Sequence, residues 1–428
     1  MLRAVPAGRR SDLFVLAGLL LLAAVLRFVD LPTRGPWDAD QGHDMLVLRA
    51  LVRDGVLPLL GPPTYIGDSH HGALYYYLLA PAAALGGGND PLLVAGAIAL
   101  AGTAAVGVTW WLARSIGGPV AGAVAGLLLA VSSAAIEEST FIWNPNVIAL
   151  SASVALACGW RAWTTGRARW WLGAAAAVAV TMQSHVLGTV LLPPLAAFLL
   201  VDARRRADPE ARTRVLVAGL AGAAIVAATY LPLLAHELGN DFTESRAALE
   251  FLRSGGPGSP LDPATRLLVV ALRILSWPLA GLFVDGLPVA VGAGVGVVAL
   301  AAWRWRVGAA DERTAVRWLG ATLAWSVAAL SLGAASLTTV VRALPVDHYH
   351  AFLDPLVVVL AGLGLARVFE RHVLGRAAAA LAVGGLVAWN LAVAPPAVAP
   401  DGGYPAPQAA ADRVLRAAGE RSIAQVSL

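Results

Sequence analysis

The sequence contains no lysine, so all 31 of its basic side chains are arginine. A single cysteine, Cys158, lies in an apolar stretch and excludes a disulfide framework. Charged residues make up only 14% of the chain, whereas a soluble domain has about a quarter. The sequence has no Walker A loop, no dinucleotide-binding glycine fingerprint and no cysteine–histidine metal motif. These absences argue against a soluble protein and against nucleotide-driven chemistry.

What the chain has instead is apolar sequence. Hydrophobic residues make up 58% of its 428 positions, and the mean hydropathy is +0.70. Stretches of the ~20 apolar residues that cross a bilayer recur along the chain. The net charge of +4 fits arginine-rich cytoplasmic loops and needs no nucleic-acid partner. The arginine, alanine and glycine bias is typical of a GC-rich bacterial source.

The arginine clusters orient the apolar stretches and predict an all-α polytopic fold with about eleven transmembrane helices, within a range of ten to thirteen. The first helix, after Arg9 and Arg10, is expected to stay uncleaved with its N-terminus inside. Two further apolar stretches, Gly72–Leu85 and Arg266–Gly286, are expected to lie at the outer interface. The alternative is that they span as well. The expected spans are 12–29, 91–113, 119–136, 147–163, 170–184, 187–201, 214–235, 287–303, 317–340, 351–369 and 377–394.

This topology predicts one membrane domain over residues 1–395, with a first extracytoplasmic loop at 30–90 and a second large outer segment at 236–286. Residues 396–428 are expected to hold a proline-rich linker, a helix over Gln408–Ala418 and a strand over Ile423–Leu428. They are interpreted either as the start of a truncated soluble domain or as a lid on the outer face.

Three carboxylates crowd into the loop after the first helix, and Asp38 and Asp44 are expected to bind substrate beside Asp40. Asp40 suits the start of an interfacial helix over Gln41–Arg53, where it would cap the helix, act in chemistry, or do both. On that helix Asp44 would share a face with Asp40. The predicted topology places this loop, and every histidine except His372, on the outer side of the membrane. We therefore expect the chemistry at the outer face.

Three other polar clusters are expected there. His70 and His71 follow an aspartate and precede tyrosines that include Tyr75, so they form either a metal site or an interfacial turn. Adjacent side chains diverge, and only His70 is considered as a metal ligand. Trp143 and Asn144 suit a sugar ring and its hydroxyls, although Asn-Pro is also an ordinary turn former. Further candidates for substrate binding are His71, Tyr75, His185, His348 and Tyr349, with Arg273 and Arg342 as phosphate ligands.

The order and spacing of these clusters resemble the GT-C glycosyltransferases, in the protein O-mannosyltransferase and aminoarabinose-transferase branch. Asp40 occupies the family's first-loop aspartate and Gly55 its helix-ending glycine, while Gln41 replaces the usual glutamate. His70 stands where aminoarabinose transferases place a metal-binding glutamate. Asn144 stands where many members have aspartate. The segment from His348 through Pro355 resembles a late Arg-Tyr segment with its arginine replaced.

The resemblance implies an enzyme that moves a sugar from a polyprenyl-phosphate donor to a glycan, lipid or protein hydroxyl, with Asp40 as general base. It implies no required cofactor and leaves a divalent metal at His70 as an alternative. It also implies a multi-pass protein of the bacterial inner or plasma membrane, with its active site extracytoplasmic and no nucleic-acid partner. Two rival functions remain open: a transporter or flippase, and a non-catalytic binding protein for a lipid-linked sugar.

Overall fold

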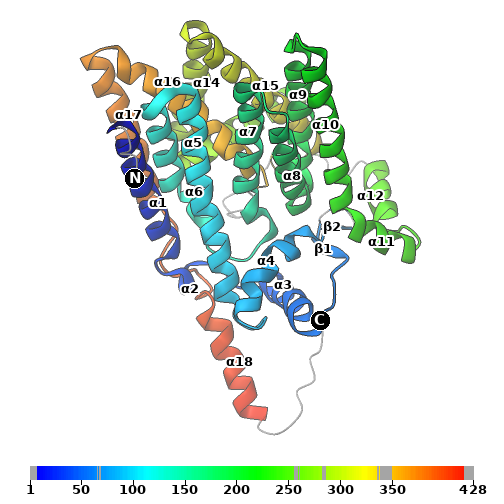
Figure 1. Ribbon diagram of the computed structural model, residues 1–428. Helices are drawn as coiled ribbons and strands as arrows, with labels where there is room; N and C mark the ends of the chain where they lie inside the picture. The colour runs from blue at the N-terminus through cyan, green and yellow to red at the C-terminus, as the bar shows by residue number, and fades with distance from the viewer. Residues whose placement is uncertain are drawn as a thin grey trace, which may run out of the picture.

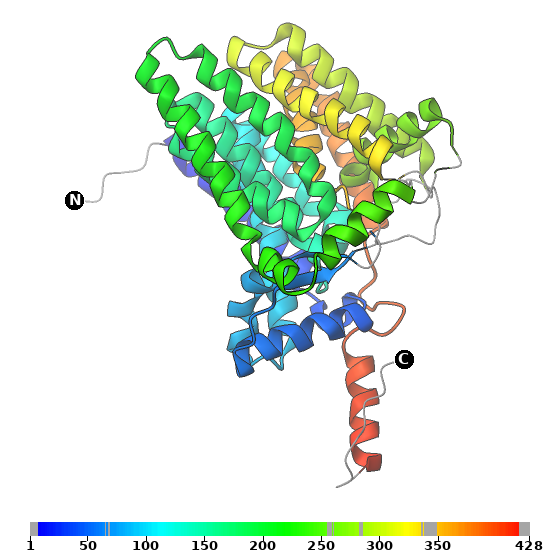
Figure 2. The same ribbon diagram turned by 90° about the vertical axis from the view of Figure 1, so that its right-hand side faces the viewer.

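The computed structural model describes residues 7–64, 66, 69–254, 259, 261–281, 286–334, 337 and 349–418. Its long helices form a bundle, and short elements of the first loop cover one end of it (Figures 1 and 2). The helices of the bundle are α1 (Ala7–Phe28), α5 (Pro91–Val131), α7 (Ile148–Thr165), α8 (Arg169–Ser184), α9 (Leu192–Arg205), α10 (Pro209–Thr229), α13 (Pro263–Ala280), α14 (Leu287–Val307), α15 (Ala310–Gly333), α16 (Asp354–Arg371) and α17 (Val373–Ala392).

The prediction of an all-α membrane protein is confirmed. In the described part of the chain, ten helices are long and apolar enough to cross a membrane. One of them, α5, contains two predicted spans, because Gly118 leaves the helical region at φ 85° and Pro119 follows it. The predicted span at 170–184 is α8, which at 16 residues is shorter than the ten.

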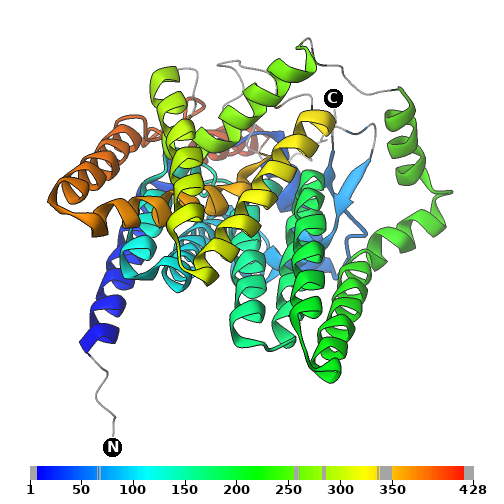
Figure 3. The same cartoon turned by 90° about the horizontal axis from the view of Figure 1, so that it is seen from above.

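Helix α16 lies inside the bundle (Figure 3). The apolar window that includes it is 83% buried, because α5, α14, α17 and α13 pack around it. Glycines and alanines such as Gly362 and Ala361 let these neighbours approach closely. The N-terminal end of this rigid helix therefore offers a fixed position for the residues that precede it.

An arginine of α1 closes the end of α5. Arg27 is fully buried and donates to the carbonyl oxygens of Leu129 and Ala130, at 3.2 and 3.0 Å. These carbonyls lie in the last turn of α5, where no helical donor reaches them. The same guanidinium donates to Ser139 Oγ at 3.2 Å, so α1, α5 and the following loop are fixed together.

One expectation about the spans concerns α13. Helix α13 belongs to the stretch that is expected at the outer interface, since this stretch carries Arg266, Arg273 and Pro278, yet it is among the ten helices that are long and apolar enough to cross. Arg273 is only 3% exposed, since its side chain lies over Trp277 within the bundle. A buried arginine is hidden from lipid, so this residue does not argue against spanning. The interfacial position of α13 stays a prediction.

The first loop builds a layer of short elements below the bundle (Figure 1). Its two strands pair antiparallel, with Leu60 opposite Gly72 and Pro63 opposite His70. Helix α4 has 12 residues, which is too short to cross a bilayer, as predicted for this stretch. The elements are α2 (Leu31–Arg34), α3 (Ala39–Arg49), the π-helical turn η1 (Ala50–Asp54), β1 (Leu60–Pro63), β2 (His70–Gly72) and α4 (Leu74–Leu85).

The remaining elements flank this layer. Helices α11 (Leu231–Gly239) and α12 (Thr243–Ser254) form a hairpin beside the strands (Figure 1). Helix α18 (Pro405–Ala418) includes the stretch Gln408–Ala418 that was expected to be helical, whereas the predicted strand at Ile423–Leu428 lies outside the described residues. The short connecting helices are α6 (Ser133–Glu137), η2 (Asn144–Val147), η3 (Val186–Leu191) and η5 (Ala351–Leu353).

Candidate active site

The acidic loop leads into helix α3, and its cap is Asp38. The Asp38 carboxylate accepts a hydrogen bond from the backbone N–H of Asp40 at 2.9 Å. Gln41 completes a capping box, because its side-chain oxygen accepts from the Asp38 N–H at 2.7 Å. The interpretation of Asp40 as the cap is therefore wrong, and its exposed side chain is left available in the first turn of α3.

Gly55 ends this interfacial segment, as its place in the sequence predicted. It has the left-handed conformation, with φ 69°, and its N–H bonds back to the Ala50 carbonyl. Glycine adopts this conformation at little cost.

The pKa of the Asp40 carboxyl is raised above its ordinary value. Partial burial is the largest cause, and the negative charges of Asp38 and Asp44 add to it, while His43 opposes them. A carboxylate with a raised pKa is a stronger proton acceptor, which suits a general base.

Asp44 lies one turn after Asp40 in α3, and its residue is 3% exposed. Its two carboxylate oxygens accept hydrogen bonds from the hydroxyls of Tyr75, at 3.0 Å, and Tyr76, at 2.7 Å. These bonds join α3 to α4. Asp44 and Tyr75 were predicted to bind substrate, but their mutual bonding in a buried layer favours a supporting role.

The second outer loop lies directly against α3. The amide of Gln41 donates to the Ile142 carbonyl at 3.1 Å, next to Trp143 in the chain. The side chain of Asn144 donates to the Ser184 carbonyl at 2.5 Å and so fixes the backbone just before His185. Asn144 thus positions the site through the backbone, and its amide nitrogen is engaged by protein.

Four predicted binding residues from distant parts of the sequence form one row of rings. The Tyr349 ring stacks on His185, with centroids 4.3 Å apart and an interplanar angle of 13°. Trp143 lies 5.6 Å from Tyr349 on one side, and His71 lies 5.2 Å from His185 on the other. Trp143 and Tyr349 are partly exposed, whereas the two histidines are buried. The row therefore presents aromatic faces at its Trp143 end.

His71 is held neutral in this row. Burial and the neighbouring His70 lower the pKa of its imidazole to about 4. The backbone here is also tightly packed, since a Cβ atom at Gly72 would collide with the side chain of Gln183. Gln183 accepts from the Leu74 N–H at 3.3 Å, which joins α8 to the start of α4.

His70, the predicted metal ligand, is bonded to a carboxylate of α12. Its backbone N–H and ring Nδ1 lie 2.5 and 3.1 Å from the two oxygens of Glu244. His236 approaches the same carboxylate at 3.9 Å. Across the described ranges no group of three or more histidine, cysteine or acidic side chains is arranged to hold a metal. A metal at His70, and metal dependence with it, stays a prediction.

Arg273 lies in a separate buried cluster. Its guanidinium is 5.3 Å from the centre of the Trp277 ring, and Trp277 donates to Glu138 at 2.8 Å. The ring of His350 meets Trp277 edge-on at 5.2 Å. Burial raises the pKa of Glu138 to about 8, helped by Glu137 and opposed by the Trp277 bond and Arg27. The other two candidates, Arg342 and His348, lie outside the described residues.

The sequence reasoning missed Tyr76, Gln183, Trp277 and Glu244. Tyr76 had a signal, because it adjoins Tyr75 at the start of an interfacial helix. Glu244 lies 174 positions from His70, and no local pattern indicates that pairing.

Comparison with known proteins agrees with this architecture. A family model described as dolichyl-phosphate-mannose-protein mannosyltransferase matches residues 70–232. No curated protein matches the sequence. Among solved structures, ArnT from Cupriavidus metallidurans bound to undecaprenyl phosphate is 17% identical with a TM-score of 0.57, over 94% of this chain and 72% of that one. Its apo structure is 16% identical with a TM-score of 0.55, over 88% and 74%.

The archaeal oligosaccharyltransferase AglB from Archaeoglobus fulgidus, in complex with an inhibitory peptide and a dolichol-phosphate, is also similar. It is 14% identical with a TM-score of 0.53, and the match covers 91% of this chain and 56% of AglB. At such identities the likeness is one of fold. The chain has the membrane fold of the GT-C glycosyltransferases, and its resemblance to their protein mannosyltransferase and ArnT-like branch, predicted from the sequence, is confirmed.

Proposed function

We propose that this protein is a membrane glycosyltransferase that moves a sugar from a polyprenyl-phosphate donor to an acceptor hydroxyl. The observation that carries the proposal is that the three carboxylates of the acidic loop have different hydrogen-bond partners. Asp38 caps α3 and Asp44 is bonded to two tyrosines. Asp38 and Asp40 are both exposed, but within the described residues only the Asp40 carboxylate of the three accepts no hydrogen bond. The fold supports the donor class, since ArnT is described with undecaprenyl phosphate and AglB with a dolichol-phosphate.

In the proposed reaction Asp40 accepts the proton of the acceptor hydroxyl as its oxygen attacks the anomeric carbon of the sugar. The bond from that carbon to the phosphate oxygen breaks, and the polyprenyl phosphate leaves with the electron pair. General base catalysis of this kind contributes about 10²–10⁴-fold.

The row of aromatic rings is suited to binding the sugar of the donor. Carbohydrate rings present apolar C–H faces, and the partly exposed Trp143 and Tyr349 offer flat surfaces for them. The bond from Gln41 to the Ile142 carbonyl holds these rings against the helix that carries Asp40. This bond would hold a sugar on these rings in a fixed position relative to Asp40, which is what catalysis by positioning requires.

The proposed site is extracytoplasmic, with the N-terminus of the chain in the cytoplasm. Support comes from the arginines, since those at the turn between α16 and α17 lie at the opposite end of α16 from Tyr349. Arginine-rich ends of helices favour the cytoplasmic side.

The test is sugar transfer by the purified full-length protein, given a panel of polyprenyl-phosphate sugars and hydroxyl acceptors. We expect Asp40→Asn to lower turnover by at least about 100-fold while donor binding is retained. Asp54→Asn, a change of an exposed carboxylate in the same loop, is the matched control and should transfer normally. Full transfer by Asp40→Asn would remove Asp40 as the base. Donor movement across the bilayer without transfer would favour the transporter reading.

A further inference from the structure

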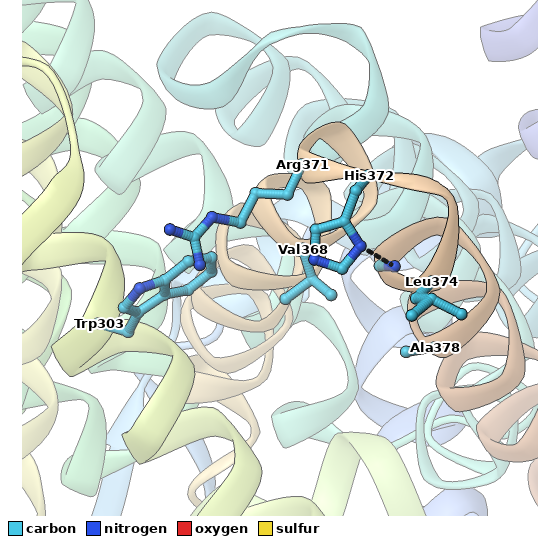
Figure 4. A pocket seen from close by; sticks show the side chains of 7 residues that line it. Trp303, Val368, Arg371, His372, Leu374 and Ala378 are labelled. Carbon is cyan, nitrogen blue, oxygen red and sulfur yellow. Dashed lines mark hydrogen bonds between the residues drawn. The ribbon is translucent and has the colours of Figure 1, made fainter.

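A cavity of about 400 Å³ lies where α16 turns into α17, far from Asp40. Trp303 of α14 forms one wall, and Arg371 and His372 form the turn above it (Figure 4). Apolar side chains, including Val368 and Leu374, complete the lining. Since α16 has 18 residues, its two ends lie about 27 Å apart, close to the thickness of a bilayer core. The cavity and the candidate active site therefore lie at opposite membrane faces.

The cavity has a cationic wall. The guanidinium of Arg371 lies over the indole of Trp303, 5.2 Å from its centre, and its side chain points towards that ring (Figure 4). Nearby, Arg304 is paired with Glu312 and Arg367 with Glu370. Within the described residues Arg371 forms no ion pair with a carboxylate. Its charge is held in place by the indole and is open to an anion from outside the chain.

The edge of the cavity is apolar. Val373 is 75% exposed and Leu374 76% exposed at the start of α17, and Leu381 is 76% exposed further along. In a chain that crosses a membrane, such side chains face the acyl chains of lipids. The cavity thus joins a fixed cation to an apolar surface that continues into the bilayer.

We propose that this cavity binds the head group of an anionic phospholipid from the leaflet opposite Asp40, with an acyl chain along α17. Arg371 would donate to the phosphodiester, and Trp303 would hold the guanidinium in a fixed orientation. A zwitterionic phospholipid carries the same phosphate, but its own cation would lie against Arg371 and weaken the attraction. The occupant is therefore a lipid with net negative charge.

The test is native mass spectrometry of the full-length protein in detergent, titrated with phosphatidylglycerol or phosphatidylcholine. We expect wild type to retain phosphatidylglycerol several-fold better. Arg371→Gln should reduce that retention about fivefold, because it removes the cation that would contact the lipid phosphate in the cavity. Arg306→Gln removes an exposed arginine near this end of α14 that does not line the cavity, and should leave retention unchanged.

Two further variants keep the test decisive if Arg371→Gln does not fold. Arg371→Lys keeps the charge and should keep most of the preference, and Trp303→Leu should lose it. Equal retention of the two lipids by wild type would overturn the proposal, as would full retention by both Arg371→Gln and Trp303→Leu. An Arg371-dependent preference for undecaprenyl phosphate over phosphatidylglycerol would also overturn it, by assigning the cavity to a polyprenyl lipid.

Discussion

The side chain of Asp38 holds the backbone N–H of Asp40 at 2.9 Å, and this bond fixes the roles of the two carboxylates. A cap must point back at the start of its helix, so Asp38 is occupied. The carboxylate two positions later lies in the first turn with its side chain exposed. The same bond brings the charge of Asp38 close to Asp40 and contributes to the raised pKa of Asp40.

The first prediction follows from this coupling. Asp38→Asn keeps a capping oxygen but removes a negative charge, so the pKa of Asp40 should fall. A base is active when deprotonated, and the acid limb of the transfer rate should therefore move to lower pH. The measurement is turnover against pH. Asp262→Asn, at the cap of α13, is the control, and an unmoved acid limb in Asp38→Asn would contradict the coupling.

The second prediction concerns the support beneath the base. Tyr76→Phe removes a hydrogen bond to the buried Asp44 carboxylate, and should cost about 1.5–3 kcal/mol of the free energy of unfolding. Tyr77→Phe is the comparison, because Tyr77 donates to the neutral Pro58 carbonyl and should cost about 1 kcal/mol. Thermal unfolding in detergent measures both. Equal losses would show that the charge on Asp44 adds nothing.

The third prediction concerns the ring row. Tyr349→Leu removes the stack on His185 and the contact with Trp143. Such contacts are worth about 0.5–1.5 kcal/mol, so KM for the sugar donor should rise about two- to twelvefold. Tyr349→Phe keeps the ring and should stay close to wild type. A large loss in the phenylalanine variant would assign the effect to the hydroxyl instead of the stack.

The fourth prediction concerns His70. Because Glu244 binds both its backbone and its ring, Glu244→Ala should free the α11–α12 hairpin from β2. Hydrogen exchange of residues 243–254 should become faster, while exchange in α16 stays slow. If added zinc slows exchange at His70 in the wild type, the metal alternative is correct and this assignment of His70 fails.

The fifth prediction concerns the segment after α17. Asp401 accepts from the Trp37 and Gly403 N–H groups, each at 2.9 Å, and Tyr404 lies 4.9 Å from the Trp37 ring. Asp401→Ala should loosen the loop that leads into α3 and lower kcat more than it changes KM. Asp401→Asn keeps one acceptor oxygen and should restore part of kcat. A change confined to KM would place this segment in donor binding.

The sequence reasoning found the helices because hydrophobicity and arginine placement are local signals, and it selected Asp40 through the spacing to Gly55. It could not decide whether Asp40 caps α3, acts in catalysis or does both, because Asp38 and Asp40 are equally good N-caps by residue type. It took Arg273 as evidence that the stretch Arg266–Gly286 does not cross the membrane. Whether one arginine is buried depends on residues elsewhere in the chain, which the local sequence does not show. The ring row was predicted residue by residue, but its assembly joins His71, Trp143, His185 and Tyr349 across most of the chain, which no local pattern encodes.

The bond between Trp37 and Asp401 has a consequence for how the protein is made. It joins two residues 364 positions apart, one just after the first helix and the other after the last helix of the bundle. The acidic loop is synthesised long before α17, yet it gains this neighbour only after α17 has been translated. The site therefore cannot reach its final shape before α17 has been inserted, and a chain that lacks the segment after α17 has an incomplete site.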